Sequence, residues 1–176
     1  AKKFNIGIKN FSEVVKINPA AKTITVKHVK TGATTEESYD KLIISTGARP
    51  IKPAITGIED AQNVFTLRNI PDMDKIKAYI TEHQVKRATV IGGGFIGIEV
   101  AENLHERGLF VTLVEGADQI LAPFDPEMAA IVHAHMREKH VELYLSAKVE
   151  RFEDKADNTV VYLHNGKRLQ ADIVIL

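Results

Sequence analysis

The sequence predicts an α/β fold built around a parallel sheet, and three observations support this. A glycine-rich turn at residues 92–97 joins a short apolar run to a stretch with helical spacing. Apolar runs alternate with helical patterns through residues 71–145, as in repeated strand–helix units. Residues 1–50 and 141–171 instead contain short strand-like runs separated by turns. With 176 residues, the chain is long enough for one domain to one and a half.

The composition excludes several classes of protein. Hydrophobic residues make up 44% and charged residues 26%, as in an ordinary globular chain. The 23 basic and 23 acidic residues cancel, which disfavours nucleic acid or an anionic membrane as the main partner. No apolar run reaches the roughly 20 residues of a membrane span, and no signal peptide is visible, so a cytoplasmic origin fits. Without cysteine, the chain has no disulfide, thiolate metal site or thiol nucleophile.

The first 70 residues predict strands followed by a connection. Residues 4–8 alternate apolar and polar side chains, which indicates a half-buried strand. Residues 14–17 and 23–26 continue the pattern with a β-branched bias. Residues 42–44 form a short apolar run typical of a strand buried on both faces. Residues 51–70 show little periodicity and are expected to be a connection.

The remaining residues predict helices alternating with strands. Pro71 favours a helix N-terminus, with Ile76, Tyr79 and Ile80 on its buried side. The pair Asn165-Gly166 is typical of a hairpin turn. The expected elements are a helix from 71, a strand at 88–91, a helix at 95–107, a strand at 110–115, a helix at 125–140 and strands at 141–145, 149–152, 160–163, 168–170 and 172–176.

The glycine turn predicts a dinucleotide site because its context has the required parts. Gly92 permits a sharp turn, Gly94 lets the backbone approach a pyrophosphate, and Gly97 lets the helix pack closely. The phosphates would lie at the positive end of the helix that follows. The alternative is a tight strand–helix turn that binds nothing.

Glu115 supplies the acid that this type of site needs, 18 residues after Gly97. A carboxylate there can accept hydrogen bonds from the ribose hydroxyls and would repel a 2′-phosphate. Residues 116–119 contain no arginine to pair with such a phosphate, so NADH is favoured over NADPH. The alternative is an ordinary solvated acid at a strand end.

The remaining acidic and histidine residues have ordinary structural explanations when judged from the pattern alone. Glu99 is expected in the first helical turn, where an acid compensates the helix dipole. His133 and His135 are two residues apart on a helix and point to different faces, so no metal site is expected. No serine-nucleophile motif is present.

An internal repeat indicates that the chain is a piece of a larger protein. Residues 2–46 match the strand rhythm of residues 139–176. If the match is not a chance likeness of two meanders, a second glycine motif should precede residue 1, at least about 40 residues upstream.

Two motifs in order carry a family resemblance. Residues 39–50 resemble the second flavin motif of the flavin-dependent pyridine nucleotide–disulfide oxidoreductases, and residues 90–102 resemble their NAD motif. The resemblance extends over essentially the whole chain. Residues 66–72 and 127–130 are most similar to the coenzyme A-disulfide reductase branch, with NADH oxidases and peroxidases as close relatives.

The resemblance implies the domain organisation. Residues 1–50 would be the C-terminal β portion of an FAD-binding domain and residues 51–70 a connection. Residues 71–176 would be a Rossmann-like, three-layer NAD(P)-binding domain, truncated at its last strand. The redox cysteine, the first flavin motif and the dimerisation domain would lie outside this chain.

The resemblance also implies a reaction. Hydride would pass from NAD(P)H to FAD and on to a cysteine redox centre, which reduces a coenzyme A disulfide or persulfide. The full-length enzyme would be a homodimer acting on a small-molecule disulfide, and the fragment alone would be inactive. Alternatives are an NADH oxidase or peroxidase, or a flavin-free nucleotide-binding module.

For the nicotinamide, the resemblance implies roles for three residues beside the glycine turn. Glu99 and Ile96 would hold the ring near the flavin, and Phe95 could fill the empty nicotinamide position. The alternative for Phe95 is an ordinary core residue.

For FAD, the resemblance implies that Thr46 and Gly47 approach the ADP part. Val14 would meet the adenine through its backbone. A plain core valine is the alternative for Val14.

Overall fold

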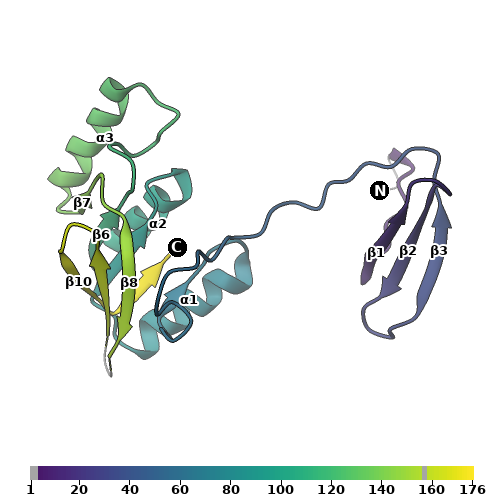
Figure 1. The fold of residues 1–176 in the computed structure, drawn as a ribbon, viewed down its shortest axis with the longest axis horizontal. Helices are drawn as coiled ribbons and strands as arrows, with labels where there is room; N and C mark the ends of the chain where they lie inside the picture. The colour runs from purple at the N-terminus through teal and green to yellow at the C-terminus, as the bar shows by residue number, and fades with distance from the viewer. Residues whose placement is uncertain (1–3, 156–157) are drawn as a thin grey trace. The chain divides into compact units, whose positions relative to one another are not determined.

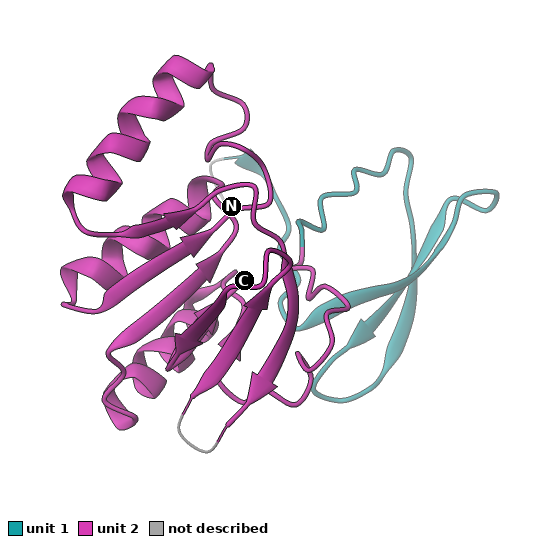
Figure 2. Cartoon of the chain, turned by 60° about the vertical axis from the view of Figure 1, so that its left-hand side comes forward, with its two compact units in different colours: residues 1–48 teal, residues 49–176 magenta. Residues whose placement is uncertain are grey.

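The computed structural model describes residues 4–155 and 158–176 of the chain. It divides into two compact units, Ala1–Ala48 and Arg49–Leu176 (Figure 2).

The second unit is organised around an all-parallel sheet. Each neighbouring pair of strands is joined in parallel register, for example Val90 opposite Leu113. Helices cover one face of this sheet and strands cover the other, so its short strands are buried on both faces. This burial explains why the strands are rich in Val, Ile and Leu. In spatial order the five strands are β4 (Val64–Phe65), β11 (Ile173–Ile175), β5 (Arg87–Ile91), β6 (Phe110–Val114) and β7 (Glu142–Tyr144).

Helices α1 (Ile70–Glu82), α2 (Phe95–Glu106) and α3 (Pro126–Glu138) accompany this sheet (Figure 1). The start of α1 is fixed by a reciprocal cap that the helix pattern alone did not predict. The Asp72 N–H donates to the Asn69 side chain at 3.0 Å, and the Asn69 N–H donates to the Asp72 carboxylate at 3.3 Å. A hydrophobic core between helices and sheet then buries residues of both, including Ile76, Ala101, Leu104, Leu113 and Ile173.

An antiparallel sheet forms the third layer. Its strands are β8 (Val149–Asp154), β9 (Thr159–Leu163) and β10 (Arg168–Ala171), with β9 in the centre. Phe152, Val161 and Leu163 pack with Val114 and Val174 of the parallel sheet in a second core. The α/β fold with a parallel sheet and an added meander is therefore confirmed. No helix among residues 4–155 and 158–176 is long and apolar enough to cross a membrane.

The segment expected to be only a connection contributes to the second unit. It supplies β4, an edge strand of the parallel sheet, and the buried side chain of Asn63. The Asn63 amide donates to the carbonyls of Ala171 and Asp172 at 3.2 and 3.0 Å, and its oxygen accepts from the Thr159 hydroxyl at 2.6 Å. Two residues are too few to show an alternating sequence pattern, so β4 is recognised only from its long-range contacts in the structure.

Asp172, directly before β11, links this strand to β5, which lies on the other side of β11 from β4. Its carboxylate accepts the backbone N–H groups of Lys86 and Arg87 at 3.0 and 2.9 Å. It also accepts the Arg87 guanidinium, with Nη2 at 2.8 Å. Burial raises the pKa of Asp172, but these donors outweigh burial and hold the pKa below its ordinary value.

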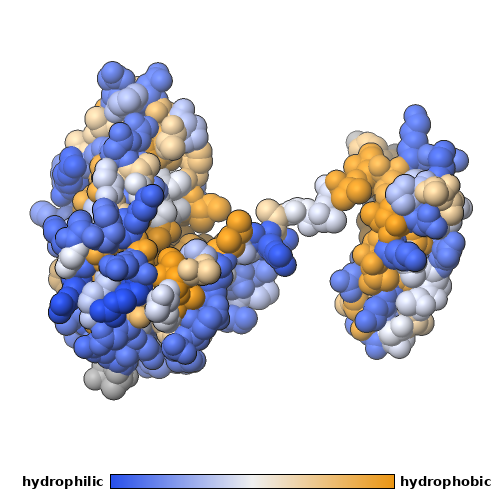
Figure 3. Space-filling view, in the orientation of Figure 1, coloured by the Kyte–Doolittle hydropathy of each residue, from blue (hydrophilic) through white to orange (hydrophobic). Residues whose placement is uncertain are grey.

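The first unit is a three-stranded antiparallel meander of β1 (Ser12–Asn18), β2 (Thr23–His28) and β3 (Thr34–Ser38). The sequence pattern missed β3, which has no apolar residue. Much of the meander's apolar surface is exposed, including Val14 and Val15 at 50% each (Figure 3). The pairing shifts register between Val14 and Lys16.

That register shift has a counterpart in the second unit. The β8–β9 pairing shifts register between Val149 and Arg151, in the first strand of its meander, as the β1–β2 pairing does between Val14 and Lys16. A β-bulge is a specific local feature rather than a general property of strands. The two meanders therefore share more than a generic strand rhythm.

Two expected strands are wrong. Residues 4–8 form a short turn and then irregular chain, and residues 42–44 have no regular structure. Ile43 is 89% exposed. A strand needs a neighbouring strand, and neither run belongs to any of the sheets that the described residues form.

Candidate dinucleotide site

The glycine turn lies where the strand order of the parallel sheet reverses. From β5, the chain passes through α2 to β6 on one side, whereas β11 lies on the other side of β5. In open parallel sheets, ligands bind beyond the carboxyl ends of the strands at this switch point. Residues 92–94, directly after β5, occupy this position.

Two of the predicted glycines are needed by the turn itself. Gly92 has φ +111°, which strains any other residue, and its N–H donates to the Val114 carbonyl at 2.9 Å. A Cβ on Gly92 would meet nothing within 4 Å, so conformation rather than space requires glycine there. A Cβ on Gly97 would lie 1.9 Å from the Gly92 carbonyl oxygen. Gly97 is therefore required mainly by its close approach to the turn. The same Cβ would lie 3.6 Å from Val90 Cγ1 of the strand, which is an ordinary contact.

Gly93 is a third constrained glycine, which the sequence analysis did not single out. A Cβ there would lie 2.6 Å from Ile120 Cγ2. The Gly93 N–H donates to Glu115 Oε2 at 2.6 Å, and its carbonyl accepts from the Leu121 N–H at 2.8 Å. The sequence feature that could have pointed to Gly93 is the run of three consecutive glycines, of which the motif requires only the first and the third.

Gly94 differs from the others. It is exposed, has φ −76° and ψ −179°, and a Cβ would meet nothing within 4 Å. It is the N-cap of α2, and its carbonyl accepts the first helical bond, from the Ile98 N–H at 3.0 Å. Because glycine has no side chain to accept them, the N–H groups of residues 95–97 remain oriented outward for an anion.

Glu115 follows β6 and contacts the glycine turn. Its Oε2 accepts from Gly93, its Oε1 accepts from the Ala117 N–H at 2.7 Å, and its own N–H donates to the Tyr144 carbonyl at 2.8 Å. The acid is therefore not simply solvated. Each carboxylate oxygen has a second lone pair, so the group can still accept from a ligand hydroxyl.

The residues predicted for the nicotinamide are all exposed. Phe95 is 56% and Ile96 66% exposed, so the alternative of a core role for Phe95 is wrong. The Phe95 ring packs edge-on against Phe124 with ring centroids 5.8 Å apart. Glu99 is the fifth residue of α2, and the expectation that it lies in the first turn is wrong. Dipole compensation falls off beyond that turn, which weakens this explanation of Glu99.

The residues predicted for FAD lie in the first unit. Val14 is in β1 and half exposed, so the alternative of a plain core valine is wrong. Thr46 and Gly47 lie in exposed chain without regular structure, and Gly47 has φ +70°, a conformation that favours glycine. Their local features are compatible with a flavin contact.

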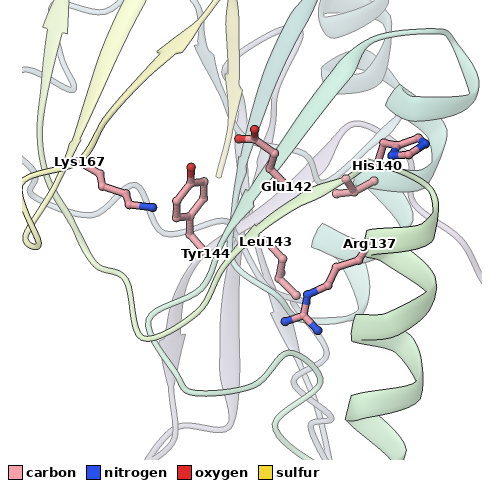
Figure 4. Close-up of a pocket in the computed structure, with 7 residues that line it drawn as sticks. Arg137, His140, Glu142, Leu143, Tyr144 and Lys167 are labelled. Carbon is pink, nitrogen blue, oxygen red and sulfur yellow. The ribbon is translucent and has the colours of Figure 1, made fainter.

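A surface hollow of about 530 Å³ lies elsewhere, beside the edge strand β7 (Figure 4). Arg137, His140, Tyr144 and Lys167 are among its lining residues, and it includes neither the glycine turn nor Glu115. Lys167 Nζ lies 4.5 Å from the centre of the Tyr144 ring. Burial raises the pKa of Tyr144, and the nearby Glu142 carboxylate raises it further. This hollow is distinct from the dinucleotide site.

Comparison with known families identifies the family of this chain. The family model described as "Pyridine nucleotide-disulphide oxidoreductase" matches residues 1–176. The chain belongs to this family. Members of the family are oxidoreductases that bind NAD(P)H and FAD.

Individual relatives span two branches of this oxidoreductase family. The chain is 35% identical over 173 residues to a coenzyme A disulfide reductase of Staphylococcus haemolyticus, covering 98% of the chain and 38% of that protein. It superposes on reduced Bacillus anthracis CoADR-RHD with TM-score 0.91 and 55% identity, covering 99% of the chain and 31% of that structure. The NADH-bound, water-forming NADH oxidase of Lactobacillus brevis gives TM-score 0.81 and 34% identity, with 94% and 36% covered. The chain thus spans about a third of the length of these relatives.

Proposed function

We propose that this oxidoreductase chain binds NADH through its glycine turn and carries the nicotinamide-binding part of a flavoprotein disulfide reductase. The observation that carries the proposal is the α2 N-terminus, where Gly94 leaves open space before outward N–H groups. That space and those donors fit a pyrophosphate, which carries negative charge at the positive end of the helix.

Glu115 would select the dinucleotide. Its two oxygens keep lone pairs for the adenosine ribose hydroxyls while holding the Gly93 and Ala117 N–H groups. A 2′-phosphate would place a second negative charge beside this carboxylate, and residues 116–119 offer no arginine. NADH is therefore the preferred coenzyme.

Phe95 and Ile96 would cover the nicotinamide, and Glu99 would orient it. Two large apolar side chains exposed at the start of α2 fit a ligand that excludes water. Transfer of hydride from the nicotinamide, and of the electrons on to a redox cysteine of the full-length enzyme, is the chemistry that bound FAD would supply. Thr46, Gly47 and Val14 would contribute contacts to the ADP part of that flavin.

The proposed acceptor is a coenzyme A disulfide or persulfide. The 55% identity to Bacillus anthracis CoADR-RHD and the Staphylococcus relative support this branch. An NADH oxidase or peroxidase is the second candidate, supported by the likeness to the Lactobacillus brevis enzyme. A homodimeric, cytoplasmic full-length enzyme remains a prediction.

Three measurements test the proposal. Titration of the chain with NADH and NADPH, followed by nicotinamide fluorescence, should show tighter binding of NADH. Binding of neither coenzyme would contradict the proposal. In the full-length gene product, NADH consumption should depend on coenzyme A disulfide, whereas equal consumption with oxygen alone would favour the oxidase. A full-length product purified without flavin would support a flavin-free binding module instead.

A further inference from the structure

We propose that His133, on α3, is a positioning residue for the dinucleotide site. It would hold the loop of residues 115–121 against Gly93 only while its imidazole is neutral. The effect on ligand binding rests on the proposed NADH site, whereas the effect on the loop stands on the contacts described here.

The first contact is a hydrogen bond between backbone and ring. The Ile120 N–H donates to His133 Nε2 at 3.2 Å. A backbone N–H can only donate, so Nε2 must carry a lone pair, and the proton of the neutral ring lies on Nδ1. An imidazolium has no acceptor and would lose this bond.

The second step links Ile120 to the glycine turn. The Ile120 side chain is fully buried, and its Cγ2 lies over the Cα of Gly93, where a Cβ would be only 2.6 Å away. The next residue, Leu121, donates its N–H to the Gly93 carbonyl at 2.8 Å. At the other end of the loop, Glu115 accepts the Gly93 N–H. The loop therefore holds both backbone groups and one face of Gly93, directly before the N-cap of α2.

The surroundings of His133 favour the neutral ring. Burial, followed by the Arg137 guanidinium one turn further along α3, holds the pKa of His133 below its ordinary value. The loop of residues 115–121 carries Glu115, whose oxygens are engaged, and the exposed Asp118, and the exposed Asp125 is the N-cap of α3. At neutral pH the acceptor is thus present, and it is lost as the pH falls through the lowered pKa.

The chain offers a matched control. His135 lies two residues along the same helix, is exposed, and its Nδ1 is 3.8 Å from Glu138, away from the loop. Substitution at His135 reports the general effect of changing a histidine on α3.

Isothermal titration with NAD⁺ at pH 7.5 tests the position directly. His133→Phe keeps a ring but removes the acceptor, and affinity should fall about threefold to tenfold, the range expected for one net hydrogen bond. His133→Gln keeps an acceptor at similar reach and should stay within about twofold of the unsubstituted chain. His135→Phe should leave affinity unchanged. Equal affinity of His133→Phe and the unsubstituted chain would overturn the proposal.

The pH profile separates positioning from packing. As the pH is lowered from 7.5 through the lowered pKa of His133, NAD⁺ affinity should fall in the unsubstituted chain and in His135→Phe, but much less in either His133 variant. Parallel profiles in all four proteins would refute a role for His133 protonation.

Amide hydrogen exchange provides a readout that does not need a ligand. The Ile120 amide should exchange faster in His133→Phe than in His133→Gln, and faster in the unsubstituted chain at low pH after correction for intrinsic rates. Failure of the unsubstituted chain to bind NAD⁺ would refute the proposed NADH site, and the exchange rates would then decide the role of His133. Unchanged exchange at Ile120 would overturn that role even if NAD⁺ binds.

Discussion

Replacement of Gly94 by alanine should abolish most NADH binding while leaving the fold intact. The added methyl group would occupy the open space before the α2 N-terminus, where the pyrophosphate of the proposed ligand must approach the backbone. We expect affinity to fall at least tenfold, which corresponds to about 1.4 kcal/mol.

The effect of this substitution on stability should be small. The backbone of Gly94, at φ −76° and ψ −179°, is open to any residue, and a Cβ meets nothing within 4 Å. Removing glycine restricts the unfolded chain and stabilises by about 0.4–1 kcal/mol. Alanine is also a poorer N-cap than glycine, which costs a similar amount, about 0.5–1 kcal/mol. The two effects nearly cancel, so the free energy of unfolding should change by less than about 1 kcal/mol.

Gly97→Ala is the matched comparison. Its Cβ would lie 1.9 Å from the Gly92 carbonyl oxygen, so backbone must move and stability should fall by at least about 1–3 kcal/mol. Urea unfolding followed by circular dichroism measures stability, and NADH fluorescence measures binding. Gly97→Ala should lose both, whereas Gly94→Ala should lose only binding. Unaltered NADH affinity in a folded Gly94→Ala protein would refute the assignment of this turn as the ligand site.

Three further substitutions test individual contacts. Glu115→Ala should weaken binding of NADH more than binding of NADPH; damage to the loop affects both coenzymes, so an unchanged ratio of dissociation constants would exclude the ribose contact. Asp172→Asn should destabilise the second unit by about 1–3 kcal/mol at pH 7 in urea unfolding, because the Arg87 guanidinium and the backbone of Lys86 lose a charged acceptor. Since the pKa of Asp172 is lowered on folding, its contribution is present above the ordinary pKa and lost as the pH falls through the folded value, so the difference should disappear in acid. Asn69→Ala should reduce the free energy of unfolding by about 0.5–2 kcal/mol through loss of the α1 cap, and no change would show that the cap is dispensable.

The sequence predicted those elements that are long enough to show a clear hydrophobic periodicity. Helices α1, α2 and α3 lie within one or two residues of the expected ranges, and Asn165-Gly166 does form the turn between β9 and β10. The runs at 4–8 and 42–44 failed for a physical reason. An apolar pattern records that a segment is suited to burial, but burial also requires neighbouring strands, and the described residues provide none for these runs. The equally apolar β11 pairs with β4 and β5, and its side chains are buried in the cores on both faces of the sheet.

The site was predictable where a motif defines it and unpredictable where distant residues meet. The motif supplied Gly92, Gly94 and Gly97, and the spacing supplied Glu115. The contacts of Gly93 with Ile120, and of Ile120 with His133, join three separate segments. No periodicity or motif in one segment reports a hydrogen bond to another.

The four glycines of the turn also bear on the proposal that it is a ligand site rather than a bare structural turn. Gly92 is needed for its positive φ, Gly93 because Ile120 lies over it, and Gly97 because it touches the Gly92 carbonyl. A turn that binds nothing would require all three. It would not require Gly94, whose backbone suits any residue, whose Cβ would meet only open space, and whose N-cap position serine, threonine, asparagine or aspartate would fill better. Glycine at this position gives up a side-chain cap, and a phosphate that takes the place of the missing cap accounts for that choice.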